Sequence, residues 1–275
     1  QQYNNNPEIL REILRYVFEA VKQLPRMEEK ELLPVFAAKL TGDPHYFDAG
    51  TVAERLLFII LSACWQETKD RELSEAERKN QIFYRAGILK DDLSNDTLVY
   101  GIRAWKHNGN LHKGIEGFFR EKDILQLSLN VIARLSQIRC RDNEIYIVEN
   151  PSVFAMICEE KSCMCMNGQP SLSCLMVLEL LARSGTHVFY SGDLDPEGML
   201  IAQKLSRFYP GRFTYWHMAE EDYKVCQSQE VLSERRLKML EKITDERLLP
   251  VVNNMVRCRK AGYQENLHWC SLDMQ

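Results

Sequence analysis

Hydrophobic residues divide the chain into a helical part and a part in which strands alternate with helices. In the first part, apolar side chains recur every three or four positions, which is the spacing of an amphipathic helix. This pattern predicts helices over residues 7–24, 29–39, 51–66 and 81–86. The run 56–64 is almost wholly apolar, which predicts a helix that is buried on all sides. Short strands are expected near 98–102, in a region that is otherwise mainly helical up to about residue 141.

The pattern changes at Glu144. Short runs rich in β-branched and aromatic residues predict strands at 145–148, 163–166, 187–190 and 213–217. Helices are expected between and after these strands, at 152–159, 173–183, 196–209, 219–225, 233–243 and 245–260. Strands that alternate with helices of this length predict a parallel sheet with right-handed crossovers. The predicted fold class is therefore α/β, with a parallel sheet flanked by helices in the second half.

We expect three segments along the chain. The first, 1–28, holds one amphipathic helix, and we expect it to be the remnant of a longer arm because the chain begins almost inside that helix. The second segment, 29–142, is mainly helical. The third, 143–275, is the predicted α/β domain.

Composition and charge narrow the range of functions. The 275 residues are 45% hydrophobic and 27% charged, which excludes disordered and collagen-like proteins. The formal net charge is -4, so any contact with nucleic acid must use local basic patches. No apolar run approaches the ~20 residues of a membrane span, and the start lacks the pattern of a signal peptide. We expect an intracellular, cytoplasmic protein without a membrane partner.

The nine cysteines are expected to be reduced thiols, most of them in the core. Cys158, Cys163, Cys165 and Cys174 form the tightest cluster in the sequence, and Cys64 also lies among apolar neighbours. The cluster has no paired C-x-x-C and no spaced pair of histidines, so core packing is favoured over a structural zinc site.

Acidic residues follow two of the predicted strands. Glu149 comes directly after the strand at 145–148, and Asp193 and Asp195 follow the strand at 187–190. The carboxyl ends of parallel strands meet at one edge of a sheet, where ligands bind. Three carboxylates at one edge repel each other unless a cation joins them, and hard oxygen ligands with open positions suit Mg²⁺ or Mn²⁺.

A structural explanation of the same residues stays open. In that explanation Asp193 is a helix N-cap, and Asp195 and Glu197 lie in the first turn of the helix, where acidic side chains interact favourably with the helix dipole.

Three stretches then follow one another in a specific order. They are Val148-Glu149-Asn150-Pro151-Ser152-Val153, Gly168-Gln169-Pro170-Ser171 and Gly192-Asp193-Leu194-Asp195-Pro196-Glu197-Gly198. A strand-end Glu with a later D-x-D resembles the signature of the Toprim domain of topoisomerases, primases and related nucleases. Together with the upstream stretches 41–48 and 87–94, the order resembles the JetD subunit of Wadjet anti-plasmid systems, a relative of the topoisomerase VI A subunit. This resemblance covers most of the chain.

The resemblance implies a Toprim domain over 143–275 and a DNA-binding, winged-helix-like region over 29–142. It implies a metal-dependent endonuclease that forms a homodimer and cleaves double-stranded DNA delivered by an SMC-type ATPase complex. Family members carry an amino-terminal arm, and we expect most of it to be missing from this sequence.

The resemblance also implies roles for four acidic residues. Glu149, Asp193 and Asp195 match the Toprim acidic triad, and Glu197 occupies a position where a further acid assists, so all four are expected in the metal site. We expect Asp193 and Asp195 to be the principal ligands of Mg²⁺ or Mn²⁺. Glu149 either binds the metal directly or acts through water as a base, and the sequence leaves both roles open.

Several other polar residues are candidates for substrate binding. Gln169 and Ser171 lie at a predicted strand-to-helix turn and either position phosphate or simply cap the helix. Arg139 and Arg141, with Arg134, form a basic stretch that either contacts phosphate or is a solvated face. The same two explanations apply to Lys106, His107, His112 and Lys113.

Other chemistries are weighed against hydrolysis by a bound metal. A covalent route would need a tyrosine nucleophile, and no spacing singles out Tyr46, Tyr84 or Tyr100. His45 lies alone in a Gly-Asp-Pro loop, which is more typical of a structural residue. The alternatives at the level of the whole protein are a non-catalytic Toprim-fold interaction module and a small-molecule phosphotransferase or phosphatase. The phosphate-binding pattern of a P-loop NTPase is missing from the sequence.

Overall fold

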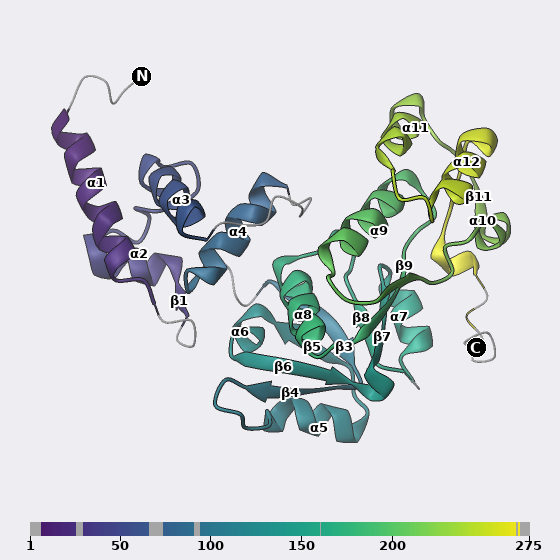
Figure 1. Ribbon diagram of the computed structural model, residues 1–275, viewed down its shortest axis with the longest axis horizontal. Coiled ribbons are helices and arrows are strands. Elements are labelled where there is room, and N and C mark those ends of the chain that lie inside the picture. Colours follow the sequence, from purple (N-terminus) through teal and green to yellow (C-terminus); the bar gives the residue numbers. More distant parts are fainter. Residues whose placement is uncertain are drawn as a thin grey trace. The chain divides into compact units, whose positions relative to one another are not determined.

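The chain divides into two compact units, Gln1–Asn95 and Asp96–Gln275. The computed structural model describes residues 7–25, 30–65, 74–90, 94–159, 161–267 and 269 (Figure 1).

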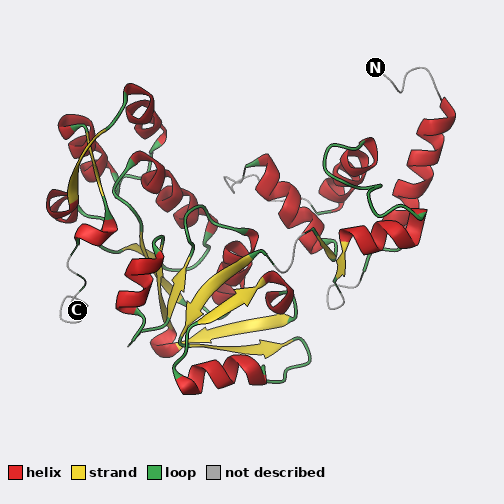
Figure 2. Ribbon diagram, turned by 180° about the vertical axis from the view of Figure 1, so that it is seen from behind, coloured by secondary structure: helices red, strands yellow, loops and turns green. Residues whose placement is uncertain are grey.

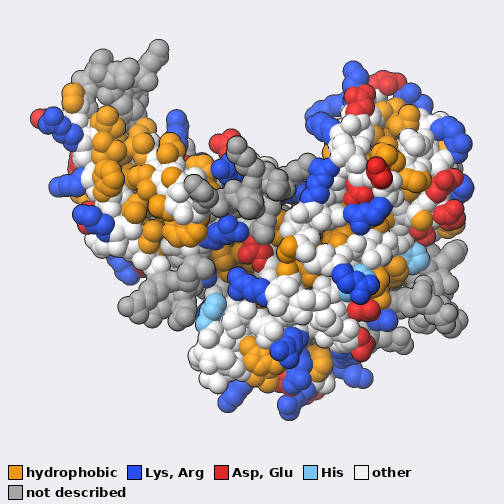
Figure 3. Space-filling view, in the orientation of Figure 1, with side chains coloured by type: hydrophobic (Ala, Val, Ile, Leu, Met, Phe, Trp, Pro, Cys, Tyr) orange, Lys and Arg blue, Asp and Glu red, His pale blue; other side chains and the backbone are white. Residues whose placement is uncertain are grey.

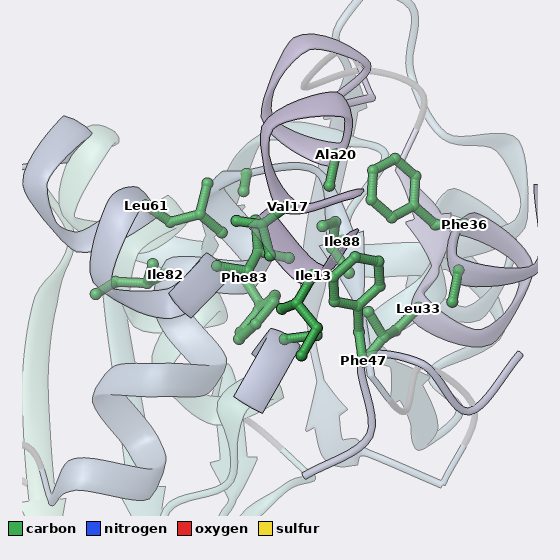
Figure 4. Packing of buried hydrophobic residues seen from close by; sticks show 14 residues of the cluster. Ile13, Val17, Ala20, Leu33, Phe36, Phe47, Leu61, Ile82, Phe83 and Ile88 are labelled. Carbon is green, nitrogen blue, oxygen red and sulfur yellow. The ribbon is translucent and has the colours of Figure 1, made fainter. Parts of the chain in front are cut away.

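The first unit consists of helices around one apolar core. Its elements are α1 (Pro7–Lys22), β1 (Glu31–Leu32), α2 (Leu33–Thr41), α3 (Val52–Cys64), α4 (Glu75–Arg85) and the short strand β2 (Ile88–Leu89). Side chains from all four helices meet in the core, among them Val17, Phe36, Leu61 and Phe83 (Figure 4). The helices predicted at 7–24 and 51–66 are confirmed over their described residues. The helix expected at 29–39 begins only at Leu33, after β1, and the helix expected at 81–86 begins earlier, at Glu75. The parallel pair formed by β1 and β2 was not predicted.

The helix α3 is not buried on all sides. Ala53, Leu57 and Leu61 recur every four residues and face the core, while Ile59 on the opposite side is 61% exposed. The prediction from the apolar run was wrong because a helix on the surface of so small a unit has a core to face on one side only.

The second unit is organised around a six-stranded sheet with the order β10-β9-β7-β8-β3-β5 (Figure 2). The strands are β3 (Asp96–Tyr100), β5 (Leu125–Ser128), β7 (Glu144–Val148), β8 (Cys163–Cys165), β9 (His187–Ser191) and β10 (Phe213–Tyr215). β7 to β10 are parallel, as predicted. β3 runs antiparallel to both β8 and β5, so the sheet as a whole is mixed. The prediction of a parallel sheet came from the alternation of strands and helices. This alternation begins only at Glu144, so it gave no information about β3 and β5.

Helices cover both faces of the sheet (Figures 1 and 2). α7 (Pro151–Ile157) packs on the face that carries Tyr146 and Val148. α8 (Leu172–Arg183) and α9 (Pro196–Phe208) lie on the other face. The predicted segments agree with these helices to within two residues at each end, because each has a clear start signal: Asn150, Ser171 and Asp195 act as N-caps.

A second pair of strands lies beside the main sheet. β4 (Ile102–Lys106) and β6 (Leu135–Cys140) are antiparallel, with α5 (Lys113–Glu121) and α6 (Leu129–Ile132) next to them. Residues 96–142 were expected to be mainly helical, and this expectation was wrong for most of the segment. The remaining α-helices and strands of the described residues are α10 (Glu220–Cys226), β11 (Gln227–Val231), α11 (Glu234–Met239), α12 (Leu249–Cys258) and β12 (Lys260–Gly262), and single helical turns lie at Arg141–Asn143, Leu240–Lys242 and Gln264–Asn266. Of the helices in the described residues, none has both the length and the apolar character needed to cross a bilayer.

The division between the units does not coincide with the expected boundary at 142/143. β3 and β5 precede that boundary, yet they hydrogen-bond into the same sheet as β7 to β10. The segment 96–142 therefore belongs structurally to the second unit.

Candidate active site

Glu149 and Asp193 follow neighbouring parallel strands. β7 and β9 pair in register through Val148 and Ser191, and the two acids come one and two residues after these partners. The prediction that both acids lie at the carboxyl edge of the sheet, next to each other, is confirmed.

Two glycines allow the loop after β9 to pack closely. A Cβ at Gly198 would lie 2.2 Å from the carbonyl oxygen of Asp193. A Cβ at Gly192 would lie 2.6 Å from Tyr190 Oη and 3.1 Å from Glu149 Oε2. Neither position can take a side chain without displacing its neighbours. Gly198 therefore allows the start of α9 to lie against Asp193. Gly192 allows the loop after β9 to lie against Glu149 and Tyr190.

Burial and mutual repulsion raise the pKa values of the two acids. Burial is the largest cause for Glu149, followed by the charges of Asp193 and Asp195, and its pKa reaches about 7. Burial raises the pKa of Asp193 to about 6, although the backbone N–H of Gln264 donates to Asp193 Oδ1 at 3.0 Å and acts in the opposite direction. Ionising both carboxyls is therefore unfavourable in the folded chain, and a bound cation would relieve this cost.

Three buried side-chain oxygens around these acids have no hydrogen-bond partner among the described residues. They are Glu149 Oε2, Tyr190 Oη and Gln264 Oε1. Tyr190 pairs with Ile147 across β9 and β7, which makes it a diagonal neighbour of Glu149 on one face of the sheet. Gln264 Nε2 donates to Ser191 Oγ at 2.9 Å. Buried polar atoms nearly always have partners, so these three oxygens are available to bind ordered water or a polar ligand.

A segment late in the chain completes this edge. Leu194 and Gly262 form an antiparallel bridge, with both N···O distances 2.9 Å. This bridge brings the short helix Gln264–Asn266 to the site, where Asn150 Nδ2 donates to Glu265 Oε1. The sequence pattern did not identify this contribution, because a single helical turn with no motif carries no recognisable signal.

Arg236, on α11, binds Asp195 and Glu197. Its Nη2 donates to Asp195 Oδ2 at 2.5 Å and to Glu197 Oε2 at 2.6 Å. The other oxygen of Asp195 accepts from the backbone N–H of Gly198 at 2.7 Å, so Asp195 is the N-cap of α9. The N-cap role that the sequence allowed for Asp193 thus belongs to Asp195. Burial raises the pKa of Asp195 even though Arg236 acts in the opposite direction.

Gln169 and Ser171 both follow β8, at the same edge as Glu149. Gln169 is exposed. Ser171 Oγ accepts from the backbone N–H of Cys174 at 3.3 Å, so Ser171 is the N-cap of α8. The structure therefore gives Ser171 a capping role and leaves the side chain of Gln169 accessible at the edge.

Arg139 and Arg141 lie at the opposite end of the parallel strands. The backbone N–H of Arg141 donates to Ser162 Oγ at 2.9 Å, just before the first residue of β8. The Arg139 guanidinium lies 5.1 Å from the ring centre of Trp105. The sheet thus separates these arginines from Glu149, and they do not share a site with it.

The other candidates have structural contacts or lie apart from the acids. His45 pairs with Asp48 at 2.8 Å on an exposed turn of the first unit, and His112 is the N-cap of α5. Tyr100 is in β3 and is almost fully buried. The prediction of core thiols is confirmed for Cys158, Cys163, Cys165 and Cys174, whereas Cys64 is exposed.

Only part of the predicted acidic set is arranged to accept a metal ion. Within the described residues, no three His, Cys, Asp or Glu side chains form a ready-made metal-binding group. Mg²⁺ does not need one, because it keeps several waters and is often held by one or two carboxylates together with substrate phosphate. Glu149 and Asp193 fit such a site, because Glu149 Oε2 has no protein partner among the described residues and both pKa values are raised by crowded negative charge. The oxygens of Asp195 are instead engaged by Arg236 and Gly198.

Residues 125–269, which are more than half of the chain, match the sequence profile described as "Protein of unknown function C-terminus (DUF2399)". The chain belongs to this family. Residues 1–104 match a second profile, "Protein of unknown function N-terminus (DUF3323)". The DUF2399 part contains Glu149, Asp193, Arg236 and Gln264, so the whole acidic edge lies within it. The chain matches none of the curated proteins with which it was compared.

Proposed function

We propose that this chain is a metal-dependent DNA endonuclease, the JetD nuclease of a Wadjet plasmid-defence system. The combination of DUF3323 and DUF2399 regions in one chain supports this assignment, as does the Toprim-like order of Glu149 and the 192–198 motif. One observation carries the proposal: Glu149 and Asp193 follow neighbouring parallel strands, and Glu149 Oε2, Tyr190 Oη and Gln264 Oε1 are buried without a partner among the described residues.

We assign the parts of the proposed activity to the two units. The second unit is the proposed Toprim domain, because its parallel strands β7 to β10 place acids at their carboxyl ends. The helical first unit is the proposed DNA-binding, winged-helix-like part. In the second unit, Lys and Arg side chains also surround an apolar patch over β4 and α5 (Figure 3). Arg139 and Arg141 would contact DNA away from the scissile phosphate.

Glu149 and Asp193 would hold a Mg²⁺ or Mn²⁺ ion. Such an ion, when bound, neutralises the phosphate charge and lowers the pKa of water. Glu149 Oε2 either binds this ion directly or, one water away from it, accepts the proton of that water, and the same oxygen does not do both at once. Gln169 lies exposed at the same edge and is the candidate for a direct phosphate contact. Asp195 fixes the start of α9, and Arg236 places a positive charge beside that edge.

The proposed substrate is double-stranded DNA delivered by an SMC-type ATPase complex. Cutting both strands with one centre per chain requires two chains, so we propose a homodimer whose two-fold axis matches that of the duplex backbone. Light scattering on the intact protein tests this state, and a strictly monomeric protein that makes double-strand breaks would contradict it.

The nuclease proposal is tested with purified full-length protein, a circular plasmid and Mn²⁺ or Mg²⁺. We expect linear product with the metal and none with a chelator. Glu149→Gln and Asp193→Asn should each lower cleavage at least about 100-fold, within the range typical of a lost general base or metal ligand. Glu246→Gln is the matched control, because Glu246 is an exposed carboxylate next to Arg247, which contacts the Phe213 carbonyl at the opposite end of the parallel strands, and it should leave cleavage unchanged.

The outcomes separate the alternatives. Full cleavage by both site variants would overturn the site. Metal binding without any cleavage of plasmid, even with the ATPase complex present, would favour an interaction module. Release of phosphate from small phosphoesters, with DNA left intact, would favour a phosphatase or phosphotransferase.

A further inference from the structure

The acidic edge of the second unit has two halves with opposite properties. The open half consists of Glu149 and Asp193, where carboxylate oxygens are crowded and Glu149 Oε2 has no partner among the described residues. The closed half consists of Asp195, Glu197 and Glu230 around the guanidinium of Arg236.

In the closed half, hydrogen bonds reach every carboxylate oxygen. Asp195 uses one oxygen for the Gly198 N–H and the other for Arg236 Nη2. Both oxygens of Glu197 accept from Arg236 Nε, at 3.1 and 2.9 Å.

The third acid of the closed half is satisfied in the same way. Glu230 Oε1 accepts from Arg236 Nη1 at 2.6 Å, and its second oxygen accepts from the Tyr263 hydroxyl. One arginine thus contacts three acids that come from the start of α9 and from β11.

We propose that Arg236 replaces a second metal ion, so that each chain binds one divalent cation in the open half only. This inference rests on the proposed function and deepens it. It also departs from the expectation that Asp195 is a principal metal ligand, because the ligand oxygens of Asp195 are already occupied.

The physical argument is charge compensation. A guanidinium is always protonated and presents its donors in a rigid fork that matches carboxylates, so it is a permanent counter-charge for Asp195 and Glu197. The Arg236 side chain is only 23% exposed, so little solvent screens its charge. A divalent cation in the closed half would have to displace Arg236 and would be repelled by it. A cation in the open half meets the carboxylates of Glu149 and Asp193, on which no Lys or Arg of the described residues acts.

Titration of the full-length protein with Mn²⁺, followed by electron paramagnetic resonance of the unbound ion, tests this inference. We expect one Mn²⁺ per chain for the wild type. Glu149→Gln should weaken its binding at least about tenfold, an effect of the size seen for lost metal-site partners. Glu197→Gln should weaken binding far less than Glu149→Gln does, since Glu197 neutralises Arg236 rather than the metal.

Substitutions of Arg236 give the complementary result. Arg236→Gln removes the charge and should allow a second, weaker Mn²⁺ to bind. Arg236→Lys keeps the charge and should restore a stoichiometry of one. If Arg236→Gln does not fold, the comparison of Glu149→Gln with Glu197→Gln still decides the question.

Two results would overturn the inference while leaving a metal-dependent nuclease intact. One is two Mn²⁺ per wild-type chain, and the other is a single Mn²⁺ that is weakened by Glu197→Gln but not by Glu149→Gln. A wild-type protein that binds no Mn²⁺ would overturn both the inference and the metal-dependent function.

Discussion

At the residue scale, two buried tyrosines differ in how their hydroxyls are satisfied. Tyr209 Oη donates to the carbonyl oxygen of Thr186, whereas Tyr190 Oη has no partner among the described residues. Burial raises the pKa of Tyr190 well above its ordinary value, and the charge of Glu149 adds to the effect. The Tyr190 hydroxyl is therefore held beside the acidic site and stays protonated.

This contrast predicts the stability of two variants. Tyr209→Phe should lower the free energy of unfolding by about 1 kcal/mol, the net value of a typical hydrogen bond. Tyr190→Phe should leave it unchanged or raise it by up to about 1 kcal/mol, because it removes a buried polar atom that lacks a partner. Urea denaturation of the metal-free protein measures both. An equal loss in the two variants would mean that Tyr190 Oη has a partner in solution.

The residues of the site differ in how far the sequence could predict them. Glu149 and Asp193 follow strands that are recognisable from their β-branched and aromatic residues. The sequence could therefore predict that the two acids lie close together. Arg236 and Gln264 could not, because they lie 41 and 71 residues from the aspartates that they contact. Such contacts depend on how α11 and the last helical turn return to the sheet, which no local pattern encodes.

At the element scale, one buried glutamate connects the parts of the first unit. The Glu54 side chain, on α3, has no exposed surface, and it accepts from Lys79 of α4 and from Lys90 after β2, both at 3.0 Å. Burial raises its pKa, but the hydrogen bonds and charges of Lys90 and Lys79 more than offset this, so the net pKa is lowered.

A lowered pKa in the folded state determines the sign of the pH effect. The stabilisation from ionised Glu54 is complete above its ordinary value of 4.5 and is lost as the pH falls towards the folded-state pKa. Glu54→Gln should lower the free energy of unfolding at pH 7 by about 2–4 kcal/mol, because two lysines lose their counter-charge.

Urea denaturation at neutral and acidic pH checks this prediction. The difference between wild type and Glu54→Gln should narrow below pH 4.5. Glu12→Gln, an exposed carboxylate on α1, is the control and should have little effect at either pH. A difference that is independent of pH would show that packing, rather than charge, causes the loss.

The elements themselves were predictable where a start signal and a long periodic run coincide. α9 is such a case, because Asp195 caps it and Pro196 occupies its first turn. β5 and β6 are the opposite case, since a run such as 125–128 alternates apolar and polar residues over only four positions, which is too short to identify a strand. Their identity as strands depends on pairing with β3 and β4, which is a tertiary effect.

At the scale of the whole molecule, the pairing of β3 with β8 sets the limits of the second unit. Leu98, Val99 and Tyr100 pair with the three residues of β8, all of which are fully buried. The change of hydrophobic pattern at Glu144 predicted a domain that starts at residue 143. Such a domain would lack β3, and the edge of β8 that pairs with β3 would be exposed. The change of sequence pattern at Glu144 marks where the alternation of strands and helices begins. It does not mark where the second unit begins, which is at Asp96.

This difference predicts the behaviour of two fragments. Residues 94–275 retain the complete six-stranded sheet and should unfold cooperatively in urea as an independent unit. Residues 143–275 lack β3 and β5, which exposes the edge of β8, and should aggregate or show no cooperative transition. Circular dichroism with urea denaturation distinguishes the two cases. A cooperative transition in the shorter fragment would mean that β7 to β10 and their helices form a sufficient core without the antiparallel strands.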